Sequence, residues 1–330
     1  MANTQYAADF LQSYGPQLPI NELVIEMNKL YHACEASIYD TQHPEIHDQL
    51  PLLWQEMIEH SLQQYPNRAW RILDIGCGTG FEAKQLIQNL PQGSIESIVC
   101  YDPSLEMLDS CHSAISPIFP KAFFCSDLGV VPANQGPYNL LATNSLLHHL
   151  PNPKETINHV LPLLARNAIW LAGHEPSNRF YSNRECMENY ERFLGEKRKN
   201  EWRRYFSPEK YLRRFKRMVG LENDFVNQIA NEALHRGLFK RKPSASAIDL
   251  LVDFHVAHTI EEAEAGRGFD FEVLQQNFDG FWCLIYVKSY SFMGPYYEGN
   301  LSNRWLYLCR NLAYKFPMDG ANFCSVWARQ

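Results

Sequence analysis

The sequence predicts an α/β protein built around a doubly wound, mostly parallel β-sheet. Apolar runs typical of buried strands alternate with helix signals along the middle of the chain, from residue 71 to residue 173. These runs are nearly continuous in apolar side chains, as expected for strands that are covered on both faces. The first run ends in a glycine-rich turn, and polar side chains follow several others, at the edge where such sheets bind ligands.

Seven segments are expected to form the strands of this sheet. They cover residues 71–75, 97–101, 122–126, 138–144, 168–173, 282–290 and 322–328. Helices are predicted between them. One covers 81–90 and is stopped by Pro91, and another opens at Pro103, since proline favours the first helical position. A third begins at Asn152 as the capping residue, with Glu155 three positions later.

The chain divides into a core and two helical additions. The spacing of Leu23, Met27 and Leu30 predicts that residues 1–66 form a helical N-terminal cap, interrupted by a polar break at 37–51. The core is expected at 67–176 and 268–330. The regular alternation stops after residue 176, and residues 177–267 read as a helical lid insertion over the active edge of the sheet.

Size and composition narrow the class of protein. The chain has 330 residues and 45% hydrophobic residues, which suits a globular protein with a large core. The start of the sequence does not resemble a signal peptide, and no apolar run is long enough to span a membrane. The nine cysteines form no C-x-x-C pair, which argues against a disulfide framework and a cysteine-rich zinc site. A cytoplasmic protein without membrane partners is expected.

The charge is unevenly distributed. The net charge is −7, which does not favour a general nucleic-acid binder. Residues 177–220 nevertheless hold 13 Lys and Arg against 6 Asp and Glu. This local excess could attract an anionic substrate or surface, or it could be a solvated helix face.

The glycine-rich turn covers residues 76–80, with the spacing G-x-G-x-G. Glycines at a strand-to-helix junction allow a ligand to lie close to the backbone. Phe81 stands where the dinucleotide fingerprint requires its last glycine. The turn therefore argues against NAD or FAD and favours a nucleoside ligand without a pyrophosphate.

Four segments together resemble the class I S-adenosylmethionine-dependent methyltransferases. They are ILDIGCGTGFE at 72–82, IVCYDPS with Asp102, FFCSDL with Asp127, and NSLLHHLPNP at 144–153. The LHHLP run is similar to that of quinone and natural-product methyltransferases. The resemblance implies a seven-stranded Rossmann-like fold that ends in an antiparallel pair of strands. It also implies S-adenosylmethionine as cofactor, S-adenosylhomocysteine as product, and a small organic acceptor.

Within this resemblance the turn carries the first cofactor contacts. Gly76, Cys77, Gly78 and Gly80 are expected to face the methionine and ribose parts of the cofactor, where a Cβ at Gly78 or Gly80 would intrude. Asp74 is expected either to orient the turn or the cofactor's amino group, or only to satisfy amides of the turn.

Residues at the ends of later strands are expected to complete the cofactor site. Asp102 is expected to bind the ribose hydroxyls, or to cap the next helix. Asp127, with the Leu128 amide, is expected at the adenine amine, or as a loop cap. Asn144 is expected near the reactive methyl group, or as a capping amide, and by analogy Tyr39 closes over the cofactor.

Two pairs of residues are candidates for catalysis. His148 and His149 follow the fourth strand, and an unperturbed imidazole titrates at about pH 6.5, which suits a general base. His174 and Glu175 follow the fifth strand on the acceptor side. Each pair could instead serve packing or loop hydrogen bonds. The histidines of HPEIH at 43–47 are four residues apart, but the order is not H-E-x-x-H and Pro44 disturbs a helix start, so no metal is expected.

The leading functional prediction is in-line methyl transfer to an oxygen or nitrogen of a small organic acceptor. Two alternatives remain open. One is a tRNA-modifying or other RNA-modifying methyltransferase that uses the basic segment 192–217. The other is a non-methylating protein of the same fold. The sequence indicates neither the acceptor nor the oligomeric state.

Overall fold

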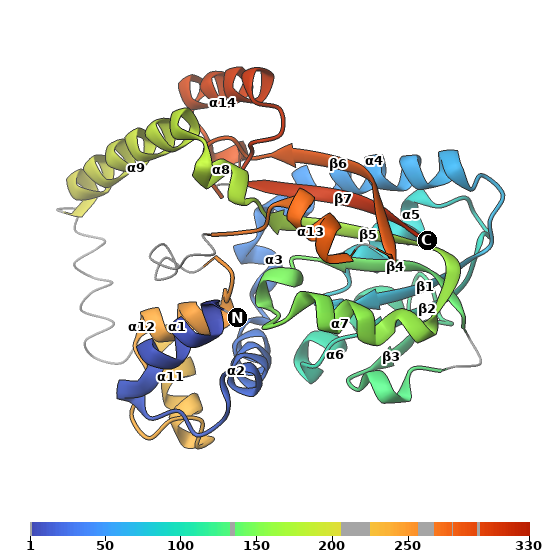
Figure 1. The fold of residues 1–330 in the computed structure, drawn as a ribbon, viewed down its shortest axis with the longest axis horizontal. Helices are drawn as coiled ribbons and strands as arrows, with labels where there is room; N and C mark the ends of the chain where they lie inside the picture. The colour runs from blue at the N-terminus through green and yellow to red at the C-terminus, as the bar shows by residue number, and fades with distance from the viewer. Residues whose placement is uncertain (1, 133–135, 206–224, 257–266, 279, 296–297) are drawn as a thin grey trace.

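The computed structural model describes the chain except residues 1, 133–135, 206–224, 257–266, 279 and 296–297. Its centre is a seven-stranded sheet with the strand order β3-β2-β1-β4-β5-β7-β6 (Figure 1). The strands are β1 (Trp70–Ile75), β2 (Ile95–Tyr101), β3 (Phe123–Cys125), β4 (Tyr138–Asn144), β5 (Leu164–Pro176), β6 (Trp282–Tyr290) and β7 (Asn322–Arg329).

The pairing of the strands is that of a doubly wound sheet. Neighbouring strands among β1 to β5 are parallel, whereas β7 runs antiparallel to both β5 and β6. The chain moves outward from β1 in both directions, so the switch point lies between β1 and β4, where such sheets bind ligands. The predicted fold class, all seven strands and the antiparallel last pair are confirmed.

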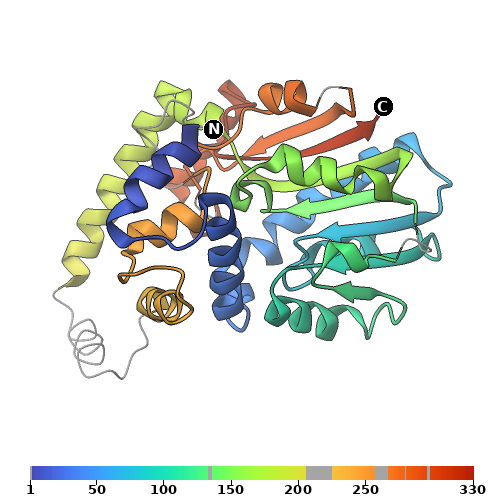
Figure 2. The ribbon, with the colours of Figure 1, turned by 60° about the horizontal axis from the view of Figure 1, so that its bottom comes forward.

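Helices cover both faces of the sheet (Figures 1 and 2). On one face lie α4 (Gln49–Gln64), α5 (Phe81–Asn89) and α6 (Leu105–Ile115), and on the other α7 (Pro153–Val160) and α13 (Phe271–Phe278). Strand side chains point alternately to the two faces. In β1, Ile72 packs in the first core and Leu73 in the second, which explains why the strands have apolar residues at successive positions.

A helical cap forms from two parts of the sequence that are far apart. It consists of α1 (Ala2–Leu11), α2 (Ile20–Glu35), α11 (Phe225–His235) and α12 (Ala245–Val252), which share one core. Leu23 and Met27 of α2 are completely buried in it against Ile248 and Leu251 of α12 and other apolar side chains. The apolar residues whose spacing predicted α2 therefore form the face of this helix that packs with α11 and α12 of the insertion.

The described parts of the predicted insertion pack in two different cores. Its first part, α8 (Asn178–Ser182) and α9 (Arg184–Tyr205), packs with α14 (Asn303–Lys315) through a core that includes Phe180 and Trp305. Figure 1 shows these helices on the opposite side of the molecule from α11. Only the later part, α11 and α12, belongs to the helical cap.

The helix after β2 begins later than predicted. It starts at Leu105 instead of Pro103, because Ser104 is the capping residue and its hydroxyl accepts a hydrogen bond from the Met107 amide at 3.3 Å. The predicted cap of α7 is confirmed, since the Asn152 Oδ1 accepts from the Glu155 amide and its Nδ2 donates to the Glu155 carboxylate.

Two segments contain more regular structure than the sequence predicts. The polar break at 37–51 includes α3 (Tyr39–Gln42) and a 3₁₀ turn over Pro44–His47. β5 extends beyond 168–173 because β7 pairs with it as far as Pro176. No helix among the described residues is long and apolar enough to cross a membrane. All nine cysteines are free thiols.

Candidate functional site

Two cavities lie at the carboxyl ends of the parallel strands. The first, called here the strand-end cavity, has a volume of about 370 Å³ and lies beside the glycine turn and the ends of β2, β3 and β4. The second, called the cap cavity, has about 410 Å³ and lies between β4, β5 and the helical cap. Both are lined by His32, Tyr39, Asn144, Ser145 and His149. The two cavities therefore share a wall.

The glycine turn forms one side of the strand-end cavity. Gly76, Gly78 and Gly80 all have positive φ angles, of 72°, 50° and 91°. A Cβ on Gly78 would meet only the Gly76 carbonyl oxygen, at 4.0 Å, so this position is open toward the cavity. A Cβ on Gly80 would instead lie 3.1 Å from the Cys111 Sγ, so that glycine permits close packing of α6. Gly78 therefore lines the cavity and Gly80 does not.

Asp102 fixes the glycine turn to the end of β2. It is buried, its Oδ2 accepts from the Gly78 amide at 3.0 Å, and its Oδ1 accepts from the Ser104 amide at 2.8 Å. Each carboxylate oxygen can accept a further hydrogen bond, and Asp102 lines the strand-end cavity. Both predicted roles, a ligand for hydroxyl groups and a local backbone partner, are compatible with this geometry.

Asp127 and Leu128 line the same cavity at the end of β3. The exposed Asp127 also caps a 3₁₀ turn, since its Oδ1 accepts from the Gly129 amide at 2.8 Å. The second carboxylate oxygen of Asp127 and the neighbouring backbone are therefore held in place at the edge of the strand-end cavity. An adenine ring would find an acceptor there for its amine.

Asn144 stands in the wall between the two cavities. Its Oδ1 accepts a hydrogen bond from the indole of Trp54 on α4 at 3.0 Å, and both side chains are buried. Because the oxygen is occupied, the Nδ2 group is the one left to donate to a ligand. Trp54 has no recognisable motif in the sequence, and its contact with Asn144 appears only in the fold.

Two predicted cofactor residues lie beneath the turn instead of in the cavity. Asp74 is fully buried and neither of its oxygens makes a hydrogen bond of normal geometry within the described part of the chain. Burial, followed by the charges of Cys111 and Asp102, raises the pKa of Asp74, and the Ala83 amide only partly offsets this. Cys77 is also buried, and neither residue is among those that line either cavity.

The short helix α3 covers the glycine turn. The Asp40 carboxylate accepts a hydrogen bond from the Thr79 hydroxyl at 2.8 Å, and Tyr39 lines both cavities. The Tyr39 ring packs on the His43 ring, with 4.4 Å between the centroids. This geometry agrees with the expectation that the segment closes over a ligand.

His148 and Glu175 form a buried pair. The Nδ1 of His148 is 3.0 Å from the Oε2 of Glu175, which is itself completely buried. Burial would lower the pKa of His148, but the hydrogen bond and charge of Glu175, together with the charge of Asp253, raise it. With Nδ1 protonated, the Nε2 of His148 is the nitrogen that can accept a proton. His148 lines the cap cavity, and its Nε2 lies 3.9 Å from the Asp253 Oδ1.

The other two candidate histidines are in different states. The Nδ1 of His149 pairs with the Val252 carbonyl at 2.7 Å, and burial together with His148 and His32 lowers the pKa of His149. His174 has a positive φ of 54° and contacts the Tyr290 hydroxyl at 2.7 Å. Burial lowers the pKa of His174 to about 4. A lowered pKa makes both rings weaker proton acceptors, so His148, whose pKa is raised, is the better candidate for a base.

A second group of ionisable residues in the cap cavity was not predicted. Glu35 at the end of α2 lies 3.5 Å from both His32 and His43. Burial would raise the pKa of Glu35, but the two histidines lower it to about 2. His43, which also contacts Glu45, has its pKa raised to about 9 by these carboxylates despite its burial. The only signals of these residues in the sequence are their polarity and their helical spacing.

Much of the basic segment 192–217 lies outside the described residues. Among its described side chains, Arg192 donates to the Asn189 side chain, and Glu196 pairs with Arg304 of α14. The sequence also predicts a helix cap at Ser207-Pro208 and a helix end at Gly220, and both positions lie outside the described residues. The nucleic-acid alternative therefore gains no support from this segment.

The strand order, the glycine turn and the carboxylates at the strand ends define the class I methyltransferase fold. The family model described as "Methyltransferase domain" matches residues 46–224, more than half of the chain. The chain belongs to this methyltransferase family, in which S-adenosylmethionine is the cofactor.

Curated relatives match less than half of the chain. A malonyl-[acyl-carrier protein] O-methyltransferase of Halalkalibacterium halodurans is 26% identical over 145 residues, which cover 40% of this chain and 52% of the relative. A demethylmenaquinone methyltransferase of Chlamydia muridarum is 28% identical over 125 residues, 38% of this chain and 51% of the relative. The chain thus spans about half the length of the curated relatives it matches.

Among solved structures, the plantazolicin methyltransferase BpumL in complex with a desmethylPZN analog and SAH aligns with 94% of this chain and 98% of its own. It is 14% identical, with a TM-score of 0.41. The magnesium protoporphyrin IX methyltransferase from Synechocystis with bound SAM aligns with 37% of this chain, with a TM-score of 0.30.

Proposed function

We propose that the chain transfers the methyl group of S-adenosylmethionine to an oxygen or nitrogen of a small organic acceptor. The observation that carries this proposal is the shared wall of the two cavities. A nucleoside-sized cavity beside the glycine turn meets a second cavity of similar volume at Asn144, Ser145 and His149. Two substrates held in these cavities would touch at that wall, which is the arrangement that a direct displacement requires.

The residues of the strand-end cavity fit the cofactor. Gly78 leaves space for a group that lies against the backbone, and Asp102 and Asp127 offer carboxylate oxygens at neighbouring strand ends. The Oδ1 of Asn28 on α2 is buried beside this cavity without a hydrogen-bond partner among the described residues, as expected where a polar ligand binds. When bound, S-adenosylmethionine supplies a methyl group that is already activated for attack.

The main task of the protein residues is therefore alignment. Holding acceptor and donor in line can contribute roughly 7–11 kcal/mol to lowering the barrier. Asn144 is held in place by its hydrogen bond from Trp54. On the side of the glycine turn, the helix α3 that carries Tyr39 is held by the hydrogen bond between Asp40 and Thr79. Residues on both sides of the wall between the cavities are therefore fixed. The buried walls also exclude water from the reacting atoms.

His148 would act as the general base. Its Nε2 would accept the proton that leaves an acceptor hydroxyl or ammonium group, and the imidazolium formed would be stabilised by Glu175 at 3.0 Å. Glu175 is a positioning residue, because it lies behind the ring and is not exposed to either cavity. A base of this kind contributes about 10²–10⁴-fold to the rate.

The cap cavity would hold the acceptor. It combines carboxylates at Glu35, Asp249 and Asp253 with Arg267 and several imidazoles, so it favours a small polar molecule over a purely apolar one. In this proposal residues 67–176 and 268–330 form the catalytic core, residues 1–66 the N-terminal cap, and residues 177–267 the lid insertion.

The proposal is tested in two steps. First, calorimetry with S-adenosylmethionine and S-adenosylhomocysteine should show one binding event per chain, which Asp102→Ala weakens. Second, a panel of small hydroxylated and amino compounds is incubated with the chain, and S-adenosylhomocysteine formation is measured. Absence of cofactor binding at millimolar concentration would refute the cofactor assignment. S-adenosylhomocysteine produced with tRNA and with no small molecule would favour the RNA alternative.

A further inference from the structure

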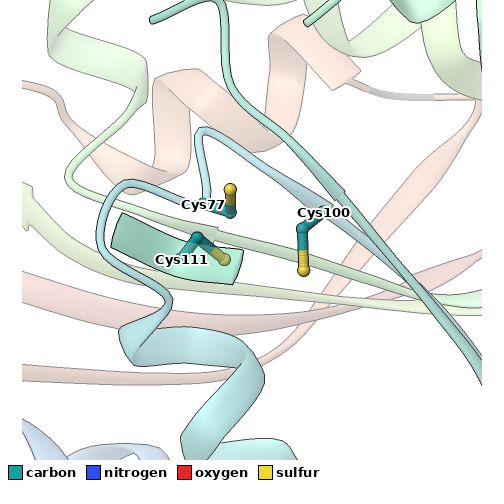
Figure 3. A group of neighbouring side chains, drawn as sticks. All are labelled: Cys77, Cys100 and Cys111. Carbon is teal, nitrogen blue, oxygen red and sulfur yellow. The ribbon is translucent and has the colours of Figure 1, made fainter. Parts of the chain in front are cut away.

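Three cysteine thiols meet beneath the glycine turn. Cys77 lies in the turn, Cys100 in β2 and Cys111 in α6, and their sulfur atoms are all within 4.8 Å of one another (Figure 3). All three side chains are at most 1% exposed. The cluster is separate from both cavities, since none of the three is among the residues that line them.

The spacing of the sulfur atoms is close to that of a metal site. In a tetrahedral zinc site each Zn–S bond is about 2.3 Å, which places the sulfur atoms about 3.8 Å apart. The three thiols of this chain would each need to move by only about 1 Å or less to reach that spacing. They are also supplied by three different packed elements, so the site needs no refolding of the backbone.

A buried carboxyl group lies beside the cluster. Asp74 is paired in register with Cys100 across β1 and β2, and its field acts on both Cys100 and Cys111. It is fully buried and both of its oxygens lack a hydrogen-bond partner of normal geometry among the described residues. A buried carboxylate of this kind needs either a proton or a neighbouring positive charge.

We propose that Cys77, Cys100 and Cys111 bind one soft divalent metal ion such as Zn²⁺. Binding replaces the thiol protons, which leave to solvent, and three thiolates around Zn²⁺ carry a net charge of −1. The buried Asp74 beside the site, in its acid form, adds no further charge. The bound ion would tie the glycine turn to β2 and to α6.

The test uses the full chain, reduced and freed of metal with a chelator. Cd²⁺ is titrated while the sulfur-to-cadmium charge-transfer absorption is recorded, and Zn²⁺ is then added as a competitor. We expect one Cd²⁺ per chain, displaced by Zn²⁺, and a higher midpoint of thermal unfolding with Zn²⁺. Cys111→Ala and Cys77→Ala should each lose the stoichiometric band and the thermal shift.

Cys186→Ala is the matched control, since Cys186 is equally buried but lies in the core around α9 and α14. It should keep both signals. Circular dichroism of each variant establishes that it folds. If Cys111→Ala does not fold, Cys77→Ala, a small change in a turn, is used in its place. No charge-transfer band in the unmodified chain, or an unchanged band in the folded cysteine variants, would overturn the proposal. Calorimetry with S-adenosylhomocysteine, done separately, reports on the proposed function.

Discussion

Glu175 holds His148 and the backbone of the turn before it with one carboxylate. Its Oε2 is 3.0 Å from the His148 Nδ1, while its Oε1 accepts from the amides of Leu146 and Leu147, each at 2.9 Å. The imidazole and the turn that carries it are therefore fixed by the same group. This explains why a fully buried carboxylate is retained there, since all its partners are hydrogen-bond donors.

Replacing His148 should affect the chemical step. His148→Gln is expected to lower kcat by about 10²–10⁴-fold, because the proton acceptor is lost. The dissociation constant of S-adenosylhomocysteine should stay nearly unchanged, since His148 lines only the cap cavity. Steady-state kinetics and calorimetry give the two values. A variant with normal kcat would show that His148 has only a packing role.

Glu175→Gln should change the pH dependence of the reaction. Glu175 raises the pKa of His148, and the base must be unprotonated to act. Removing the negative charge lowers that pKa, so the acidic limb of the kcat profile should move to lower pH. A merely structural role would reduce activity at every pH without moving the limb.

Two glycines of the turn should respond differently to alanine. Gly78→Ala places its Cβ in open space, so it should cost only the backbone strain of about 1–2 kcal/mol while weakening cofactor binding. Gly80→Ala adds contacts of 3.1 Å with Cys111 and Ile115, and should lower the free energy of unfolding further. Urea unfolding and calorimetry separate the two effects. Equal losses of stability would contradict the packing argument.

The Trp54–Asn144 hydrogen bond should be visible as a coupling energy. Trp54→Phe leaves the buried Asn144 oxygen without its donor and should lower the free energy of unfolding by about 1–3 kcal/mol. In the double variant with Asn144→Ala, the two losses should not add, because the shared bond is removed only once. Additive losses, measured by urea unfolding, would show that the contact is energetically unimportant.

The Glu35–His43 contact should make stability depend on pH. The pKa of His43 is raised from 6.5 to about 9, so its contribution is complete below pH 6.5 and is lost as the pH rises through about 9. The pKa of Glu35 is lowered from 4.5 to about 2, so its contribution is complete above pH 4.5 and is lost as the pH falls toward 2. Stabilisation by the pair is therefore largest between these limits.

His43→Gln should consequently destabilise the chain most between pH 4.5 and 6.5, with the difference shrinking above about pH 9. Urea unfolding at several pH values measures this. His159→Gln, at an exposed position on α7, is the control and should show no such dependence. A constant difference for His43→Gln across the range would mean that the contact does not depend on charge.

The sequence was sufficient to predict the strands and the residues at their ends. Asp102, Asp127 and Asn144 come from different strands, and all line the strand-end cavity because parallel strands end at one edge of the sheet. Asp74 was expected in the same place. Since alternate side chains point to opposite faces of a strand, it lies in register with Cys100 beneath the turn instead.

Contacts between distant segments could not be predicted. The cap cavity depends on α2 and α12, which meet through apolar faces that could have packed elsewhere. Glu35 ends α2 and His43 lies in the segment that reads as a polar break, and nothing in the composition of either shows which carboxylate faces which imidazole. Cys77, Cys100 and Cys111 are too far apart in the sequence to form a local motif. They come together only through the pairing of the strands and the position of α6.

The position of α2 has a consequence for the order of events in a catalytic cycle. Asn28 and Lys29 of this helix face the strand-end cavity, and Tyr31 and Glu35 face the cap cavity. One outward shift of α2 would therefore expose both ligands to solvent together. Departure of the methylated product and exchange of spent cofactor should then follow a single relaxation rate in stopped-flow experiments, instead of two independent rates.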